Sequence, residues 1–156
     1  MEKTNVMRIL DKAGIEYKAY SYLGTGAVSG EEVALALGEN PEQVFKTLVT
    51  VAKSKNHYVF LIPVKEELDL KKAATVVGEK AVEMIKQKEL LPLTGYIHGG
   101  CSPIGMKKQF KTIIDSTAQN FETIVFSAGK IGYQVETSID SISQIIPLQL
   151  TDVLKK

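Results

Sequence analysis

The sequence predicts an α+β fold in which helices pack around a mixed, mostly antiparallel sheet. The 156 residues have an ordinary globular composition, 44% hydrophobic and 24% charged, and suffice for one domain over residues 1–156 with a single core. Short β-rich runs alternate with segments of helical periodicity. Strands follow one another by hairpins as often as by helices, which favours this class over a doubly wound parallel sheet.

The first forty residues predict two helices that flank one strand. Apolar residues recur at helical spacing from Val6 to Ala13, behind Thr4 as the expected N-cap. The run Glu16–Tyr22 alternates and is rich in tyrosine, as strands are. Ser29 and Glu32 have the spacing of a capping box, which predicts a short helix that stops at Gly38.

A hairpin is predicted next along the chain. Asn40 and Pro41 are suited to the N-cap and first position of one helical turn. The β-rich runs Phe45–Ala52 and His57–Ile62 then follow, joined by four polar residues. They supply the first antiparallel pair of the predicted sheet.

The middle of the chain predicts two helices and an irregular loop. Asp69 is suited to cap a helix that runs through Val77. A second helix is predicted over Lys80–Leu90, ending before Pro92. Thr94–Gly105 holds four glycines and a proline, and is therefore predicted to be loop.

The last third predicts three more strands and a final helix. The runs Phe110–Asp115, Phe121–Ser127 and Tyr133–Glu136 have the composition of strands. Ile139–Ile146 has helical spacing. No linker, repeat or low-complexity tract interrupts the chain.

Charge and cysteine content bound the function. The formal net charge is only +1, whereas a dedicated nucleic-acid binder usually carries a strong basic excess. No apolar run is long enough for a membrane span, and the N-terminus lacks the order of a signal peptide. One cysteine suits a reducing compartment, so the cytoplasm is expected.

Conventional catalytic motifs are absent from the sequence. The only histidines are His57 and His98 and the only thiol is Cys101, and no zinc, P-loop or dinucleotide fingerprint is present. We therefore expect no metal and no cofactor. His98 and Cys101 could form a nucleophile–base pair on one loop, or be a surface histidine beside an unreactive buried cysteine.

Three features allow both a structural and a functional interpretation. The loop Gly99–Gly105 could be a tight turn, or could turn backbone N–H groups toward a carbonyl oxygen. Lys46, near the start of an apolar strand, could extend to solvent or direct its ammonium into a pocket. The segment Ser127–Gly132 could be an ordinary hairpin, or could offer a hydroxyl and N–H groups to a substrate.

Read together, five segments resemble the YbaK family, which is related to the editing domain inserted in bacterial prolyl-tRNA synthetase. They follow the order and spacing of that family over nearly the whole chain. The segments are Val44–Leu48, Leu68–Lys72, Thr94–Tyr96, Gly99–Lys108 and Ser127–Lys130.

The resemblance implies the fold and the activity. The sheet would curl partly into a barrel flanked by helices. The reaction would be cleavage of the aminoacyl ester of mischarged tRNA, chiefly Cys-tRNA(Pro), without a cofactor. In the family's scheme the thiol of the substrate cysteine attacks the ester carbonyl, so the protein orients the substrate and stabilises charge rather than supplying a nucleophile.

The resemblance also implies the site residues. Lys46 would act electrostatically and Gly100 through its backbone at the substrate carbonyl, and these two are the predicted catalytic residues. Cys101 would be a bystander in chemistry. The predicted substrate-binding residues are Tyr22, Thr47, Gly99, Cys101, Ser102, Pro103, Ser127, Gly129 and Gln134.

Two departures from the family's pattern bear on substrate preference. Where the family often carries Arg-Gly-Leu-Asp, this chain reads Ile131–Gln134, so that a neutral amide at Gln134 replaces a carboxylate. Val28 and Ser29 stand where the family has an aromatic pocket residue. Both changes leave fold and reaction intact in this interpretation.

The expected partners are the tRNA acceptor end and prolyl-tRNA synthetase, with no membrane, and the protein is expected to be a monomer or weak homodimer. Two alternatives stay open. The protein could hydrolyse another misacylated tRNA, such as Ala-tRNA(Pro), with an activated water. It could instead be a non-catalytic module that binds tRNA or a synthetase.

Overall fold

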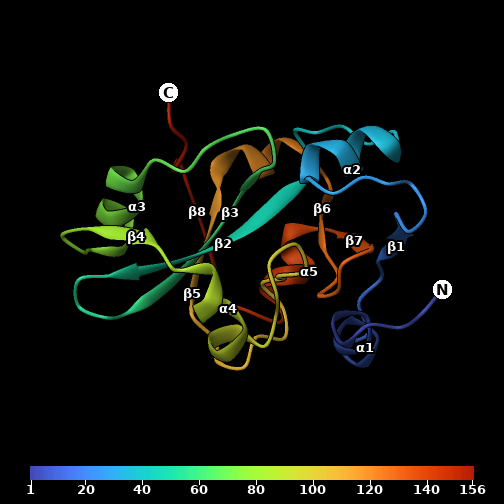
Figure 1. Cartoon of the computed structure of the whole chain (residues 1–156), viewed down its shortest axis with the longest axis horizontal. Coiled ribbons are helices and arrows are strands. Elements are labelled where there is room, and N and C mark those ends of the chain that lie inside the picture. Colours follow the sequence, from blue (N-terminus) through green and yellow to red (C-terminus); the bar gives the residue numbers. More distant parts are fainter.

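Two sheets form the framework of the computed structural model, which describes all residues 1–156 (Figure 1). The larger sheet has the strand order β4-β2-β3-β5-β8 and the smaller one β1-β7-β6. The strands are β1 (Lys18–Ser21), β2 (Phe45–Ala52), β3 (His57–Pro63), β4 (Val82–Met84), β5 (Lys111–Asp115), β6 (Ile124–Ser127), β7 (Tyr133–Thr137) and β8 (Leu148–Thr151).

Five short α-helices surround the sheets, and none has the length and apolar character that crossing a membrane requires. Thr4, Ser29 and Asp69 cap α1, α2 and α3 through their side chains, as predicted, and Ser29 does so within a capping box. The helices are α1 (Asn5–Lys12), α2 (Gly30–Ala36), α3 (Leu70–Val77), α4 (Gln87–Thr94) and α5 (Ile139–Ser143), with a 3₁₀ helix at Ser116–Asn120.

The strand pairings confirm the predicted mixed, mostly antiparallel sheet structure. Four of the six pairings are antiparallel, whereas β3 with β5 and β5 with β8 run parallel. The two sheets are connected by one bridge between Val44 and Val125. The predicted curling of a single sheet into a partial barrel is therefore not confirmed.

The central strand β3 is buried on both faces and separates two cores. Val59 and Leu61 point into the main core of 22 buried residues, together with the smaller sheet, α1 and α5. Phe60 and Ile62 point the other way, into a second core beneath α3. The strand β2 borders the main core, and this border positions the candidate site.

The prediction of one helix over Lys80–Leu90 is wrong. The segment begins with the edge strand β4, which pairs with β2 through Thr50↔Met84 and Ala52↔Val82. The free edge of β2 supplies hydrogen-bond partners that outweigh the helical pattern. The helix begins only at Gln87 and continues through Pro92, which the sequence placed beyond its end.

Two further elements differ from the predictions. Asn40 and Pro41 belong to a non-helical turn and do not start a turn of helix. The Asn40 side chain accepts from the N–H of Glu42 at 3.0 Å. The strand β8 was not predicted, because its alternating run Leu148–Thr151 is only four residues long. It lies parallel to β5 and forms one edge of the larger sheet.

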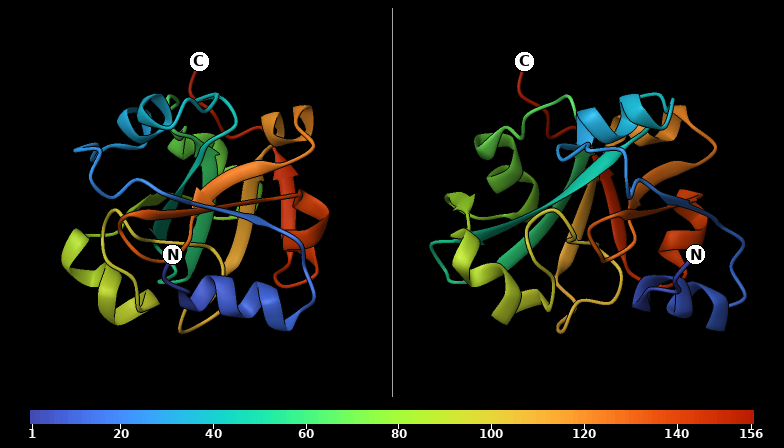
Figure 2. Two further views of the ribbon diagram at one scale, coloured as in Figure 1. Left: turned by 90° about the vertical axis from the view of Figure 1, so that its right-hand side faces the viewer. Right: turned by 45° about the vertical axis from the view of Figure 1, so that its right-hand side comes forward.

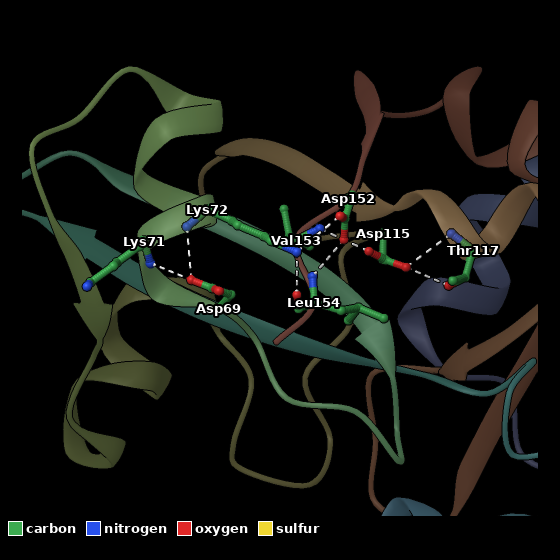
Figure 3. A network of polar contacts seen from close by, with 8 residues as sticks. All are labelled: Asp69, Lys71, Lys72, Asp115, Thr117, Asp152, Val153 and Leu154. Carbon is green, nitrogen blue, oxygen red and sulfur yellow. Dashed lines mark hydrogen bonds and ion pairs between the residues drawn. The ribbon is translucent and has the colours of Figure 1, made fainter. Parts of the chain in front are cut away.

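The C-terminal residues are fixed against the end of β5 and the start of α3 (Figure 3). The buried carboxylate of Asp115 accepts hydrogen bonds from the N–H and hydroxyl of Thr117 and, at 3.0 Å, from the N–H of Val153. The carbonyl of Val153 accepts from the N–H of Asp69 at 2.8 Å. These contacts join three segments that are distant in sequence.

Candidate active site

A cavity of about 650 Å³ lies where the start of β2 meets the smaller sheet, α2 and the glycine-rich loop after α4. Its volume is that of a site for a small molecule. Figure 2 shows the loop after α4 (yellow) passing close to the turn between β6 and β7 (orange). A Cβ atom added to Gly100 would lie 3.1 Å from the backbone nitrogen of Ile131, a tight contact that glycine avoids.

The structure brings most of the predicted site residues together around this cavity. The predicted residues in its wall are Tyr22, Lys46, Thr47, Gly99, Cys101, Ser127 and Gln134. Val28 and Ser29, the second departure from the family's pattern, also line it. The structure does not place Gly100, Ser102, Pro103 or Gly129 in the wall.

Lys46 directs its ammonium along the wall of the cavity. Nζ donates to the carbonyl oxygen of Val64 at 3.3 Å, and both residues line the cavity. The side chain is half-buried, so the alternative in which it extends freely to solvent does not hold. An ammonium has three donors, and this contact leaves two for a ligand.

Thr47 places a hydroxyl in the wall that has no partner within the protein. Its Oγ1 is buried and makes no hydrogen bond. A buried polar group without a partner costs about 1–3 kcal/mol. Because Oγ1 is closed off from solvent, it lies behind the surface of the wall and not at the cavity itself.

The glycine-rich loop is held in shape by Thr94 and Tyr96. The Tyr96 hydroxyl donates to the carbonyl of Ile104 at 2.5 Å, and the Thr94 hydroxyl accepts from the N–H of Tyr96 at 3.0 Å. The sequence matched both residues to the family but gave them no role. Their contacts show that they fix the two ends of the loop.

The N–H of Gly100, predicted to contact the substrate carbonyl, already has a partner within the protein. The N–H of Gly100 already donates to the carbonyl of Ile97 at 2.9 Å, and Gly100 lies behind the wall. The N–H groups of Cys101 and Ser102 donate to no acceptor in the chain. Since Cys101 lines the cavity, its N–H is the better candidate donor to a substrate carbonyl.

The Cys101 side chain is unsuited to nucleophilic chemistry. Burial raises the pKa of its thiol to about 12, against a lowering contribution from the Thr94 hydroxyl. The thiol is therefore neutral near pH 7, whereas a nucleophile needs the thiolate. His98 lines the same cavity but is exposed. The structure supports the alternative of an unreactive buried cysteine beside a surface histidine.

Gln134 is bound to a carboxylate that the sequence analysis missed. Only 6% of its surface is exposed. Its amide is assigned with the nitrogen toward Glu39, the orientation that satisfies both groups, and this nitrogen then donates at 2.8 Å to Oε2 and 3.2 Å to Oε1. Burial raises the pKa of Glu39 to about 7; the bond from Gln134 lowers it, and the nearby charge of Glu136 raises it further. Glu39 lies just after Gly38 in a connection between elements, where no sequence signal marks it.

The sequence analysis also missed the apolar part of the wall, which comes from elements that only the fold brings near β2. These residues would hold an aliphatic or thiol-bearing side chain away from water. Two polar residues, Glu31 and Gln87, also line the cavity. The apolar residues include Val33, Val44, Val64, Met84, Ile85 and Leu90.

Replacing Glu39 by glutamine should change how stability depends on pH. The folded chain retains the Glu39 proton up to about pH 7, whereas an ordinary carboxyl releases it near 4.5. Protonated Glu39 therefore favours the folded state, and this contribution is complete below pH 4.5 and is lost as pH rises through 7. Glutamine stays neutral at every pH. The melting temperature of Glu39→Gln minus that of wild type should therefore increase from pH 5 to pH 8.

Thermal denaturation followed by circular dichroism at both pH values measures this shift. Glu42→Gln is the matched control, because Glu42 is exposed in the same connection. Its difference from wild type should be equal at the two pH values. A Glu39→Gln difference that does not grow with pH would contradict the raised pKa.

Comparisons with known proteins agree with this geometry. The family described as "Aminoacyl-tRNA editing domain" matches residues 25–145. A protein of Enterococcus faecalis (strain ATCC 700802 / V583) named "Putative Cys-tRNA(Pro)/Cys-tRNA(Cys) deacylase EbsC" is 44% identical over 156 residues, which cover 99% of this chain and 95% of that protein.

Two solved structures share the fold. One is the crystal structure of "a putative trans-editing enzyme for prolyl tRNA synthetase", with a TM-score of 0.86, 22% identity and 100% of both chains covered. The other is that of a hypothetical protein, with a TM-score of 0.87, 20% identity and coverage of 99% and 100%. The family match spans most of the chain and includes the wall of the cavity from Val28 to Gln134. The chain therefore belongs to the aminoacyl-tRNA editing domain family.

Proposed function

We propose that this protein is a trans-editing aminoacyl-tRNA deacylase that cleaves the ester of Cys-tRNA(Pro). The observation that carries the proposal is that two residues with available donors line one small cavity: Lys46 with its ammonium and Cys101 with its free N–H. Such donors stabilise negative charge that develops on a carbonyl oxygen. The deacylase name of the relative from Enterococcus faecalis supports the same reaction.

The chemistry follows from what the cavity offers. Its one thiol is protonated, so Cys101 does not supply the nucleophile. The substrate's own thiol supplies one: its sulfur bonds to the ester carbon, the bond from that carbon to the ribose oxygen breaks, and the thiol proton ends on that oxygen. The products are a cyclic thiolactone and free tRNA. The cavity wall contributes orientation and charge stabilisation.

The low net charge of the protein supports a role for a second protein in binding the tRNA. With a net charge of +1, few phosphates are neutralised, so affinity for the body of the tRNA is low. The acceptor end would be held by the cavity, and prolyl-tRNA synthetase would supply the rest of the affinity. A monomer or weak homodimer in the cytoplasm fits this arrangement.

A panel of charged tRNAs tests the substrate and the scheme together. Cys-tRNA(Pro) should be cleaved, whereas Ser-tRNA(Pro) and Ala-tRNA(Pro) should lose their amino acid at the uncatalysed rate, because a hydroxyl is a weaker nucleophile and a methyl group is none. Release of labelled amino acid measures all three. Equal cleavage of the three esters would contradict the thiol-assisted scheme.

One observation favours a second candidate, hydrolysis of Ala-tRNA(Pro) by water. Gln134 stands where the family often has a carboxylate, and it lines the cavity. A changed wall can change the substrate that fits. In the same panel, this candidate requires that Ala-tRNA(Pro) be cleaved faster than Cys-tRNA(Pro).

A further inference from the structure

We infer that Glu39 and Gln134 form a two-residue acceptor for the α-ammonium group of the aminoacyl substrate. Gln134 contacts the ammonium through its carbonyl oxygen, and Glu39 positions Gln134 from behind. The inference rests on the proposed function, because it assigns the amino end of the same ester whose carbonyl end lies at Lys46.

The register of the smaller sheet places Gln134 at the cavity. On β7 it pairs with Tyr20 of β1 on one side and with Ser127 of β6 on the other. Side chains of paired residues project from the same face of a sheet, and Ser127 and Gln134 both line the cavity. Gln134 is more than nine-tenths buried, so it forms a built part of the wall.

The contact with Glu39 decides which end of the amide the substrate meets. The amide nitrogen donates to both carboxylate oxygens, at 2.8 Å and 3.2 Å. Both carboxylate oxygens lie on the same side of that nitrogen, so they share one N–H of the amide. The carbonyl oxygen of Gln134 faces away from the Glu39 carboxylate and can only accept. A substrate ammonium is a donor of matching kind.

Electrostatics favour a cation at this end of the cavity. Glu39 is half-buried beside Glu136, and burial raises the pKa of Glu39 to about 7. The charge of Glu136 is already held by hydrogen bonds from the hydroxyls of Tyr20 and Thr123. A bound ammonium would be attracted to Glu39 through the polarised amide.

Lys46 brings the opposite charge to the wall of the same cavity. Its ammonium repels that of the substrate and attracts the carbonyl oxygen. The Lys46 ammonium and the Glu39–Gln134 pair together would orient the aminoacyl group in one direction. Glu31 is the one carboxylate among the lining residues, but it is exposed.

The experiment compares ligands that differ only at the amino group. The ligand is cysteine joined by an amide to 3′-amino-3′-deoxyadenosine, which cannot be cleaved by the ester route. Three forms of it are compared: the free amine, the N-methyl amine and the N-acetyl amide. Calorimetry measures the affinity of the protein for each. Wild type should bind the two cationic forms about tenfold or more tighter than the acetyl form, as a charge-assisted contact does. The N-methyl form controls for added bulk.

Variants then locate the preference. Glu39→Gln should reduce the preference for the cationic forms to about twofold or less. The double variant Glu39→Gln with Gln134→Glu moves the carboxylate onto the cavity wall and should restore it. Because each ratio is measured within one variant, a general loss of stability would not reproduce this pattern. Glu42→Gln, in the same connection but exposed, should keep the wild-type ratio.

The outcomes separate this inference from the proposed function. A wild-type protein that binds all three forms equally, or a Glu39→Gln variant that keeps the full preference, would overturn the inference. So would loss of the preference in Glu31→Gln but not in Glu39→Gln. If the preference behaves as expected while Cys-tRNA(Pro) is not cleaved, the proposed deacylase activity fails and the ammonium site stands.

Discussion

Replacing Lys46 by methionine should reduce kcat/KM for deacylation of Cys-tRNA(Pro) by about a hundredfold or more, the usual loss when one donor to a developing oxyanion is removed. Methionine keeps an unbranched, flexible apolar side chain but has no ammonium. The change would break the 3.3 Å bond to the carbonyl of Val64, a loss that is small for stability. The expected effect is therefore on the reaction and not on the fold.

Initial rates of release of labelled cysteine measure this prediction. Lys53→Met is the matched control, because Lys53 directly follows the same strand but is exposed and lies outside the cavity wall. It should retain wild-type activity. A Lys46→Met variant that deacylates normally would favour the non-catalytic binding module, the alternative that the sequence left open.

Local signals in the sequence predicted most of the fold. The caps at Thr4, Ser29 and Asp69 depend on one side chain and a backbone N–H two or three residues further on, so they can be read locally. The β2–β3 hairpin has strong β-rich runs and a short connection. Lys46, on that hairpin, was therefore placed in the candidate site with its strand.

Features that depend on tertiary pairing could not be read in this way. The strand Val82–Met84 exists because β2 has a free edge, and the helical pattern around it indicated otherwise. Glu39 acquires its role only because Gln134, 95 positions later in the sequence, is folded against it. The turn that consumes the N–H of Gly100 depends on the path of a loop, which its glycines permit but do not determine.

Replacing Asp115 by alanine should have the largest effect on stability. The carboxylate is 1% exposed and accepts three hydrogen bonds, from the N–H and hydroxyl of Thr117 and the N–H of Val153. Its removal leaves the buried N–H of Val153 and the two half-buried donors of Thr117 without this acceptor. The free energy of unfolding should fall by about 3 kcal/mol, which for a chain of this size lowers the melting temperature by roughly 6–12 °C.

Thermal and urea denaturation followed by circular dichroism measure this loss, with Asp152→Ala as the control. Asp152 pairs with Lys72 at 3.0 Å in the same network, but its side chain is 51% exposed (Figure 3). An exposed pair contributes less than about 1 kcal/mol. Equal losses in the two variants would show that the buried bonds of Asp115 do not hold the C-terminal segment.

The same variant separates the framework from the site. Asp115 ends β5, which pairs with β3, and β3 in turn pairs with the strand that carries Lys46. Asp115 itself does not line the cavity. Below its melting temperature, Asp115→Ala should therefore keep the kcat of wild type per folded molecule, because a cooperative domain either retains the cavity or unfolds as a whole. A lowered kcat in the fully folded variant would instead mean that the C-terminal network positions β2 and the Lys46 ammonium.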